Sequence, residues 1–126
     1  MAPRSLVPRL TDIVEAIERV RQVVGDLALD AFEADWEKRW LVERGVEIVS
    51  EASRHLTSDL KARHPEIPWK NVADIGNVLR HAYQNVAPPV MWSLVRDHLP
   101  PLERICRAEL EVALAADMRD GNEDNT

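Results

Sequence analysis

The sequence predicts an all-α protein, an up-and-down bundle of four or five helices. Apolar Val, Ile and Leu residues recur at intervals of three and four, which lines one face of a helix, rather than alternating as in a strand. Glycine is scarce, with 4 residues among 126. Because 45% of the residues are hydrophobic, the chain has enough apolar side chains to build the core of one domain.

Three long helices are predicted in the first two thirds of the chain. The first spans about residues 8–25, and its apolar face is formed by Leu10, Ile13, Val14, Ile17, Val20 and Val24. A short helical turn over residues 30–36 leads into the second, which we expect to continue to about Arg63, before His64-Pro65. The third begins near Trp69 and runs through His81.

Prolines mark the last helical segment. Pro88 and Pro89 suit the first turn of a helix, where a missing N–H has no partner to lose, and apolar residues then recur at helical spacing to about residue 116. Pro100-Pro101 predicts a kink or a short break between two collinear pieces. Residues 117–126 are acidic and polar, so we expect a disordered tail after a single domain of residues 1–116.

Composition and charge exclude several classes of protein. The net charge of −6 argues against nucleic-acid binding through the overall field, so any contact with RNA must be local or helped by a partner. No segment approaches the ~20 apolar residues that span a bilayer, and the single cysteine, Cys106, fits a reducing cytoplasm. His55, His64 and His98 lack metal-binding spacing, so we expect neither a metal site nor a cofactor.

Small and aromatic residues predict how the helices associate. Gly45 and Ala52 on the second long helix let a neighbouring helix come close. Trp36, Trp40 and Trp92 are interpreted as anchors of the core or of a dimer, and apolar helix faces remain on more than one side of the bundle. We therefore expect a homodimer or a stable partner.

The segment Gly76–Tyr83 on the third long helix gathers the most usable chemistry. It places the Asn77 amide, the Arg80 guanidinium, the His81 imidazole and the Tyr83 phenol on little more than two helical turns. Asn77 and His81 stand four residues apart and share a face, whereas Arg80 and His81 differ by about 100°. Spacing alone also allows structural roles, in which Asn77 bridges helices and Tyr83 packs at the end of the bundle.

The order of the segments resembles the HEPN domains of the HepT type. These small helical proteins pair with MNT nucleotidyltransferases in bacterial type VII toxin–antitoxin modules. The similar segments span about 90 residues in the same order and are Leu10-Thr11-Asp12-Ile13 through Ile17-Glu18, Val42-Glu43-Arg44 through Ile48-Val49-Ser50-Glu51-Ala52, His64-Pro65-Glu66-Ile67-Pro68-Trp69, and the motif that ends in His81-Ala82-Tyr83.

The resemblance implies a metal-independent endoribonuclease that acts on RNA in the cleft of a homodimer. His81 would be the catalytic histidine that exchanges the proton of the attacking 2′-hydroxyl, and Asn77 its polar neighbour. Tyr83 would accept AMP from a cognate MNT nucleotidyltransferase antitoxin, which silences the toxin.

The motif arginine of this family falls on Gly76, which offers no donor and no charge to a phosphate. Arg80 is the candidate for this phosphate contact, reaching the site of the other chain across the dimer. A second interpretation stays open at this point: a non-catalytic HEPN module that pairs with a nucleotidyltransferase, with its nuclease site disabled at Gly76.

Overall fold

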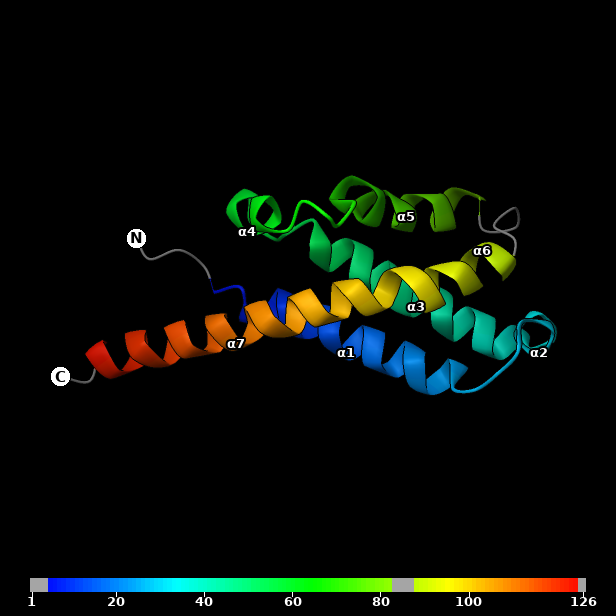
Figure 1. The fold of residues 1–126 in the computed structure, drawn as a ribbon, viewed down its shortest axis with the longest axis horizontal. Helices are drawn as coiled ribbons and strands as arrows, with labels where there is room; N and C mark the ends of the chain where they lie inside the picture. The colour runs from blue at the N-terminus through cyan, green and yellow to red at the C-terminus, as the bar shows by residue number, and fades with distance from the viewer. Residues whose placement is uncertain (1–4, 83–87, 125–126) are drawn as a thin grey trace.

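The regular structure is helical throughout the part of the chain that the computed structural model describes, residues 5–82 and 88–124 (Figure 1). The side chains of residues 80–82, 88 and 121–124 lie outside that description. The predicted all-α class is confirmed. The elements in chain order are α1 (Val7–Val24), α2 (Leu29–Ala34), α3 (Trp36–Ser53), α4 (Ser58–Arg63), α5 (Trp69–Ala82), α6 (Pro88–Ser93), the π-helical turn η2 (Leu94–His98) and α7 (Leu99–Asp124).

Helix α3 lies at the centre of the bundle. It packs against α1 on one side and α5 on the other, and α7 packs against α1 (Figure 1). The buried apolar stripe of α1 is the predicted one, and it continues into a core that draws residues from most of the helices. The largest fully buried side chains of this core are Phe32, Leu10, Ile13, Leu60, Leu79 and Leu102.

Helices α1 and α3 approach each other closely at Gly45, as predicted. A Cβ atom at this position would collide with Cγ2 of Val20, so a larger residue fits only if the Val20 side chain or one of the helices shifts. Ala52 is also buried on α3. The short distance between these two helices therefore depends on a hydrogen in place of a side chain.

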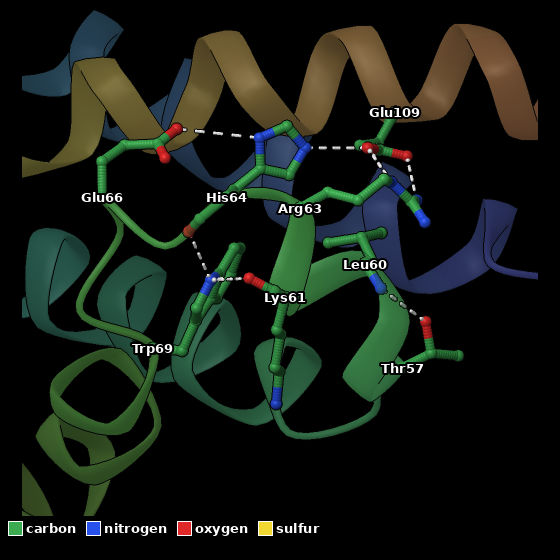
Figure 2. Close-up of polar contacts among 8 residues, drawn as sticks. All are labelled: Thr57, Leu60, Lys61, Arg63, His64, Glu66, Trp69 and Glu109. Atoms are coloured by element: carbon green, nitrogen blue, oxygen red, sulfur yellow. Dashed lines mark hydrogen bonds and ion pairs between the residues drawn. The ribbon is translucent and has the colours of Figure 1, made fainter.

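The second long helix ends earlier than predicted. Helix α3 stops at Ser53 and α4 begins at Ser58, because the Oγ1 of Thr57 accepts a hydrogen bond from the Leu60 N–H at 3.2 Å and caps a new helix (Figure 2). Leu56 and Leu60 are both buried, so the apolar pattern runs on across the turn. This continuity explains why the sequence pattern did not reveal the break.

The predicted interruption at Pro100-Pro101 is a π-helical turn that precedes the prolines. In η2 the Leu99 N–H donates to the Leu94 carbonyl, five residues back, and α7 starts at Leu99. Pro100 and Pro101 thus occupy the first turn of α7, directly after the π-helical turn.

Helix α7 also runs further than predicted. It continues to Asp124, so the expected disordered tail from residue 117 is wrong as far as the structure describes that segment. Ala115, Ala116 and Met118 favour helix, and extending a helix that has already formed needs no new nucleation. The Ser5 hydroxyl donates to the Asp117 carboxylate at 2.6 Å, which ties the start of the chain to α7.

The three tryptophans singled out above take different positions. Trp92 packs its ring 5.4 Å from that of Phe32, with the Arg96 guanidinium 4.5 Å from the Trp92 ring centre. Trp36 and Trp40 contact each other edge to face but are 54% and 63% exposed, so they are not core anchors. Their role as dimer anchors stays a prediction.

A polar cluster joins the α4–α5 connection to α7 (Figure 2). Glu109 of α7 accepts hydrogen bonds from Arg63 Nε at 3.2 Å and Nη2 at 2.8 Å, and His64 Nε2 lies 2.8 Å from the same carboxylate. The indole N–H of Trp69 donates to the carbonyls of Lys61 and His64, which fixes the start of α5. These contacts set where α5 begins relative to α7.

Acid is expected to weaken this cluster through Glu109. The hydrogen bond from Arg63, with further help from His64, holds the pKa of Glu109 below its usual value. The folded protein therefore keeps this stabilisation above the ordinary glutamate pKa and loses it as the pH falls through the lowered folded pKa. Glu109→Gln should cost about 1–3 kcal/mol at pH 7 and should make the free energy of unfolding less sensitive to acid, as measured by urea denaturation from pH 7 to about pH 3.

Glu111→Gln on the exposed face of α7 is the matched control. It changes the same charge on the same helix without touching Arg63 or His64. An equal acid sensitivity of the Glu109→Gln and Glu111→Gln proteins would contradict the assignment of this stabilisation to Glu109.

No helix within residues 5–82 and 88–124 combines the length and the apolar character needed to cross a membrane.

Candidate functional site

The predicted site residues belong to α5 or follow it. Gly76 is buried and Asn77 is exposed. Arg80 and His81 occupy helical positions near the end of α5, with their side chains outside the described part of the chain. Tyr83, the predicted AMP acceptor, lies outside the described residues. The structure thus fixes the helix that carries the motif and the beginning of the motif itself.

Ser50 of α3 connects directly to the start of the motif. Its hydroxyl donates to the Ala73 carbonyl at 2.8 Å and accepts from the Gly76 N–H at 3.1 Å, so one side chain bridges two backbone groups of α5. Ser50 is only 1% exposed, and the neighbouring Ser53 hydroxyl donates to its carbonyl at 2.7 Å. Buried hydroxyls need such partners, and the partners of the Ser50 hydroxyl are on the motif helix.

Arg54, at the end of α3, reaches the same carbonyl. Its Nε and Nη2 donate to the Ala73 oxygen at 3.1 and 2.8 Å. Its Nη1 lies 3.8 Å from Glu51, whose carboxylate is 3.2 Å from Nε2 of His55. A charged group is therefore held against α5 from outside that helix, one turn before Asn77.

Ser50 and Arg54 were not assigned a role from the sequence. A signal was present, because Ser50 and Ser53 stand on the buried face of α3 among Val46, Val49 and Ala52. Buried hydroxyls require a hydrogen-bond partner, which Ser53 finds on its own helix and Ser50 finds on α5. Which helix supplies that partner depends on the packing of α3 against α5, and the spacing does not encode this.

Other reactive groups lie away from this region or are inactive. Cys106 is fully buried, and burial raises the pKa of its thiol to about 12, with a smaller contribution from Glu109. The thiol therefore stays protonated at neutral pH and is a poor nucleophile. Within the described ranges, no three His, Cys, Asp or Glu residues gather as a group that could hold a metal ion.

Comparison with known proteins places these helices in a family. Residues 13–109 match the family described as Ribonuclease HepT-like, a range that includes most of α1, all of α3 and α5, and the first part of α7. The chain belongs to the ribonuclease HepT-like family. The HEPN resemblance found in the sequence is thereby confirmed.

Individual relatives of this HepT-like chain carry ribonuclease names. It is 37% identical over 100 residues to a probable ribonuclease HepT of Thermococcus cleftensis, covering 79% of this chain and 91% of the relative. It is 29% identical over 104 residues to the putative RNase MJ1380 of Methanocaldococcus jannaschii, covering 82% and 95% of the two chains. A putative RNase TTE0752 of Caldanaerobacter subterraneus subsp. tengcongensis is 27% identical over 97 residues, or 77% and 87% of the two chains. No solved structure matches this chain.

The HepT-like match includes the contact between α3 and the motif helix. Gly76, where the resemblance places an arginine, is one of the residues in that contact, through its N–H and the Ser50 hydroxyl. In this chain the backbone at position 76 thus takes part in the contact of α5 with a side chain of α3.

Proposed function

We propose that this chain is a metal-independent endoribonuclease of the HepT-like family, with His81 and Asn77 in its site. The observation that carries the proposal is the family match over residues 13–109, which includes the whole of α5, together with relatives named as ribonucleases. Positions 77 and 81 stand four residues apart on this helix, so their Cα atoms lie on one face of it.

The proposed reaction uses the 2′-hydroxyl of RNA as the nucleophile. His81 takes the 2′-proton while the 2′-oxygen attacks the adjacent phosphorus and the bond to the 5′-oxygen breaks. The departing 5′-oxygen takes a proton from a histidine, and the second motif of a homodimer supplies this acid. The products are a 2′,3′-cyclic phosphate and a 5′-hydroxyl, so atoms and charge balance without a metal ion.

A homodimer is part of this proposal because each cleft would be built from both chains. In support of self-association, Trp36, Trp40 and Leu41 at the start of α3 expose more than half of their surface, and the two indoles contact each other with ring centres 5.0 Å apart. A cluster of large apolar side chains in water is typical of an interface. Arg80 of one chain would then contact a phosphate in the site of the other.

The test of the proposal is cleavage of RNA by the purified chain in EDTA. We expect 5′-hydroxyl and cyclic-phosphate ends, and no cleavage of an oligonucleotide with 2′-deoxyribose at every position, because the nucleophile is then missing. The RNA ends can be identified by mass spectrometry. Cleavage that requires added metal, or equal cleavage of the 2′-deoxy substrate, would contradict this mechanism.

Regulation by a nucleotidyltransferase of the MNT type is the second part of the proposal. The Tyr83 oxygen attacks the α-phosphorus of ATP, its proton is lost, pyrophosphate leaves, and an AMP ester remains on the phenol. Co-expression with the cognate nucleotidyltransferase should add one or more AMP groups to the intact chain, and Tyr83→Phe should abolish the addition at that residue. A tyrosine that stays unmodified under these conditions would contradict the role of Tyr83.

One observation favours a different function. Gly76 is buried and has no side chain to hold a phosphate, which suits a non-catalytic module that pairs with a nucleotidyltransferase and has lost its nuclease site. This alternative predicts that the wild-type chain binds its partner but does not cleave RNA under any of the conditions above.

A further inference from the structure

We propose that Arg54, directly after α3, contacts a phosphate of the bound RNA, in place of the side chain that is missing at position 76. This inference rests on the proposed function and adds a substrate-binding residue to it. The observation behind it is that the Arg54 guanidinium is anchored on the motif helix, although the residue itself caps the end of α3.

The position of the guanidinium follows from the carbonyl that it binds. In an α-helix the carbonyl oxygen of one residue points towards the N–H four residues later. The Ala73 oxygen therefore lies beside the turn that contains Gly76 and Asn77, and the guanidinium 2.8 Å from it lies beside the same turn. The guanidinium therefore lies at the same height along the axis of α5 as the side chain of an arginine at position 76 would begin.

The guanidinium is also held in a defined orientation. Nε and Nη2 donate to one oxygen, which restricts rotation of the side chain, and a planar fork held in this way is preorganised for a further anion. The N–H groups of Nη1 do not donate to the Ala73 oxygen. The hydrogen bonds that hold the guanidinium on Ala73 therefore leave the Nη1 side of the group for a ligand.

Glu51 is the group with which a phosphate would compete. Its carboxylate lies 3.8 Å from Nη1, beyond hydrogen-bond distance, and 55% of the Glu51 side chain is exposed, against 34% for Arg54. Exposed ion pairs of this kind contribute little to stability and are screened by salt. A phosphate that makes a charge-assisted hydrogen bond to Nη1 can therefore displace this contact.

Charge explains why such a residue is needed. The chain carries a net charge of −6, so an RNA phosphate requires a local cation. Among the α5 side chains that the structure describes, Lys70 and Asp74 are charged, and Lys70 is two turns before Asn77. Arg63 is engaged with Glu109 at 2.8 Å. Among the arginines that the structure describes, Arg54 is hydrogen-bonded to the motif helix.

The experiment compares four variants of the full chain. Arg54→Gln removes the charge, and Arg54→Lys keeps it without the fork. Arg44→Gln makes the same charge change on α3, ten positions before Arg54, where Arg44 is 3.4 Å from Glu47. Ser50→Ala breaks the other side-chain bond to Ala73 but leaves the guanidinium in place.

Two readouts separate phosphate contact from a structural role. The first is the salt dependence of binding to a 2′-O-methyl RNA oligonucleotide, which the proposed reaction cannot cleave, measured by fluorescence anisotropy. The second is kcat/KM for cleavage of the matching RNA. Arg54→Gln should lower the slope of log Kd against log salt by about 0.7, the effect of one lost phosphate contact on a single strand. It should also lower kcat/KM at least about tenfold, with Arg54→Lys between it and the wild type.

The control variants fix the interpretation. Arg44→Gln and Ser50→Ala should keep the wild-type salt slope, while Ser50→Ala should lower the melting temperature. An Arg54→Gln protein with the salt slope and kcat/KM of Arg44→Gln would overturn the assignment, even if the wild type cleaves RNA. A wild type that binds RNA with the predicted Arg54 dependence but does not cleave it would instead overturn the proposed nuclease and leave Arg54 as a phosphate contact. A wild type that neither binds nor cleaves RNA would overturn both.

Discussion

Replacement of His81 by alanine is expected to lower the rate of RNA cleavage about 10²- to 10⁴-fold, the range typical for the loss of a general acid–base group. The proposed reaction needs a group that accepts a proton from the 2′-hydroxyl near neutral pH, and imidazole is the side chain whose ordinary pKa suits this role. Because the substitution removes a chemical step, kcat should fall far more than the affinity for a 2′-O-methyl RNA.

The matched control for His81→Ala is His98→Ala. His98 is an exposed histidine of η2, on a different element from the motif. The His98→Ala protein should cleave RNA at the wild-type rate. Both variants should have the wild-type melting temperature, as measured by circular dichroism. Cleavage by His81→Ala at an undiminished rate would remove His81 from the mechanism. A loss in both variants would indicate a general effect on the protein.

Replacement of Gly76 by arginine is expected to destabilise the protein rather than to increase its activity. Gly76 is buried, and its N–H donates to the Ser50 hydroxyl at the contact between α3 and α5. A long charged side chain introduced at this buried position must displace its neighbours or turn out towards solvent. Overpacking of this kind costs about 1–3 kcal/mol in the free energy of unfolding, which urea denaturation will measure.

Val78→Arg is the matched control for Gly76→Arg. It adds the same charge to α5 two residues later, at a side chain that is 44% exposed, and should leave stability close to that of the wild type. Faster RNA cleavage by Gly76→Arg than by the wild type, at undiminished stability, would contradict this expectation. It would show that the site is complete only with an arginine at 76, as the non-catalytic alternative requires.

The long helices could be predicted because their apolar residues repeat over several turns. The stripe from Leu10 to Val24 and the prolines at 88 and 89 both lie where the pattern placed them. The break after Ser53 was missed because Leu56 and Leu60 stay buried on both sides of it. The end of α7 was missed because polarity predicted disorder, whereas the segment extends an existing helix.

The candidate site was predictable in a different way. Asn77 and His81 are proposed through the resemblance of their segment to a family, which requires no knowledge of packing. Ser50 and Arg54 join this region through contacts with residues 19 to 26 positions away, and these exist only after α3 and α5 have packed. Spacing within one helix contains no information about such partners.

The carbonyl oxygen of Ala73 attaches the motif helix through two separate side chains. It accepts from the Ser50 hydroxyl and from two nitrogens of Arg54, so three hydrogen bonds converge on one atom. Because the two side chains reach this oxygen independently, the loss of one leaves the bonds of the other. The turn that precedes Asn77 is therefore expected to stay attached to the end of α3 when either residue alone is replaced.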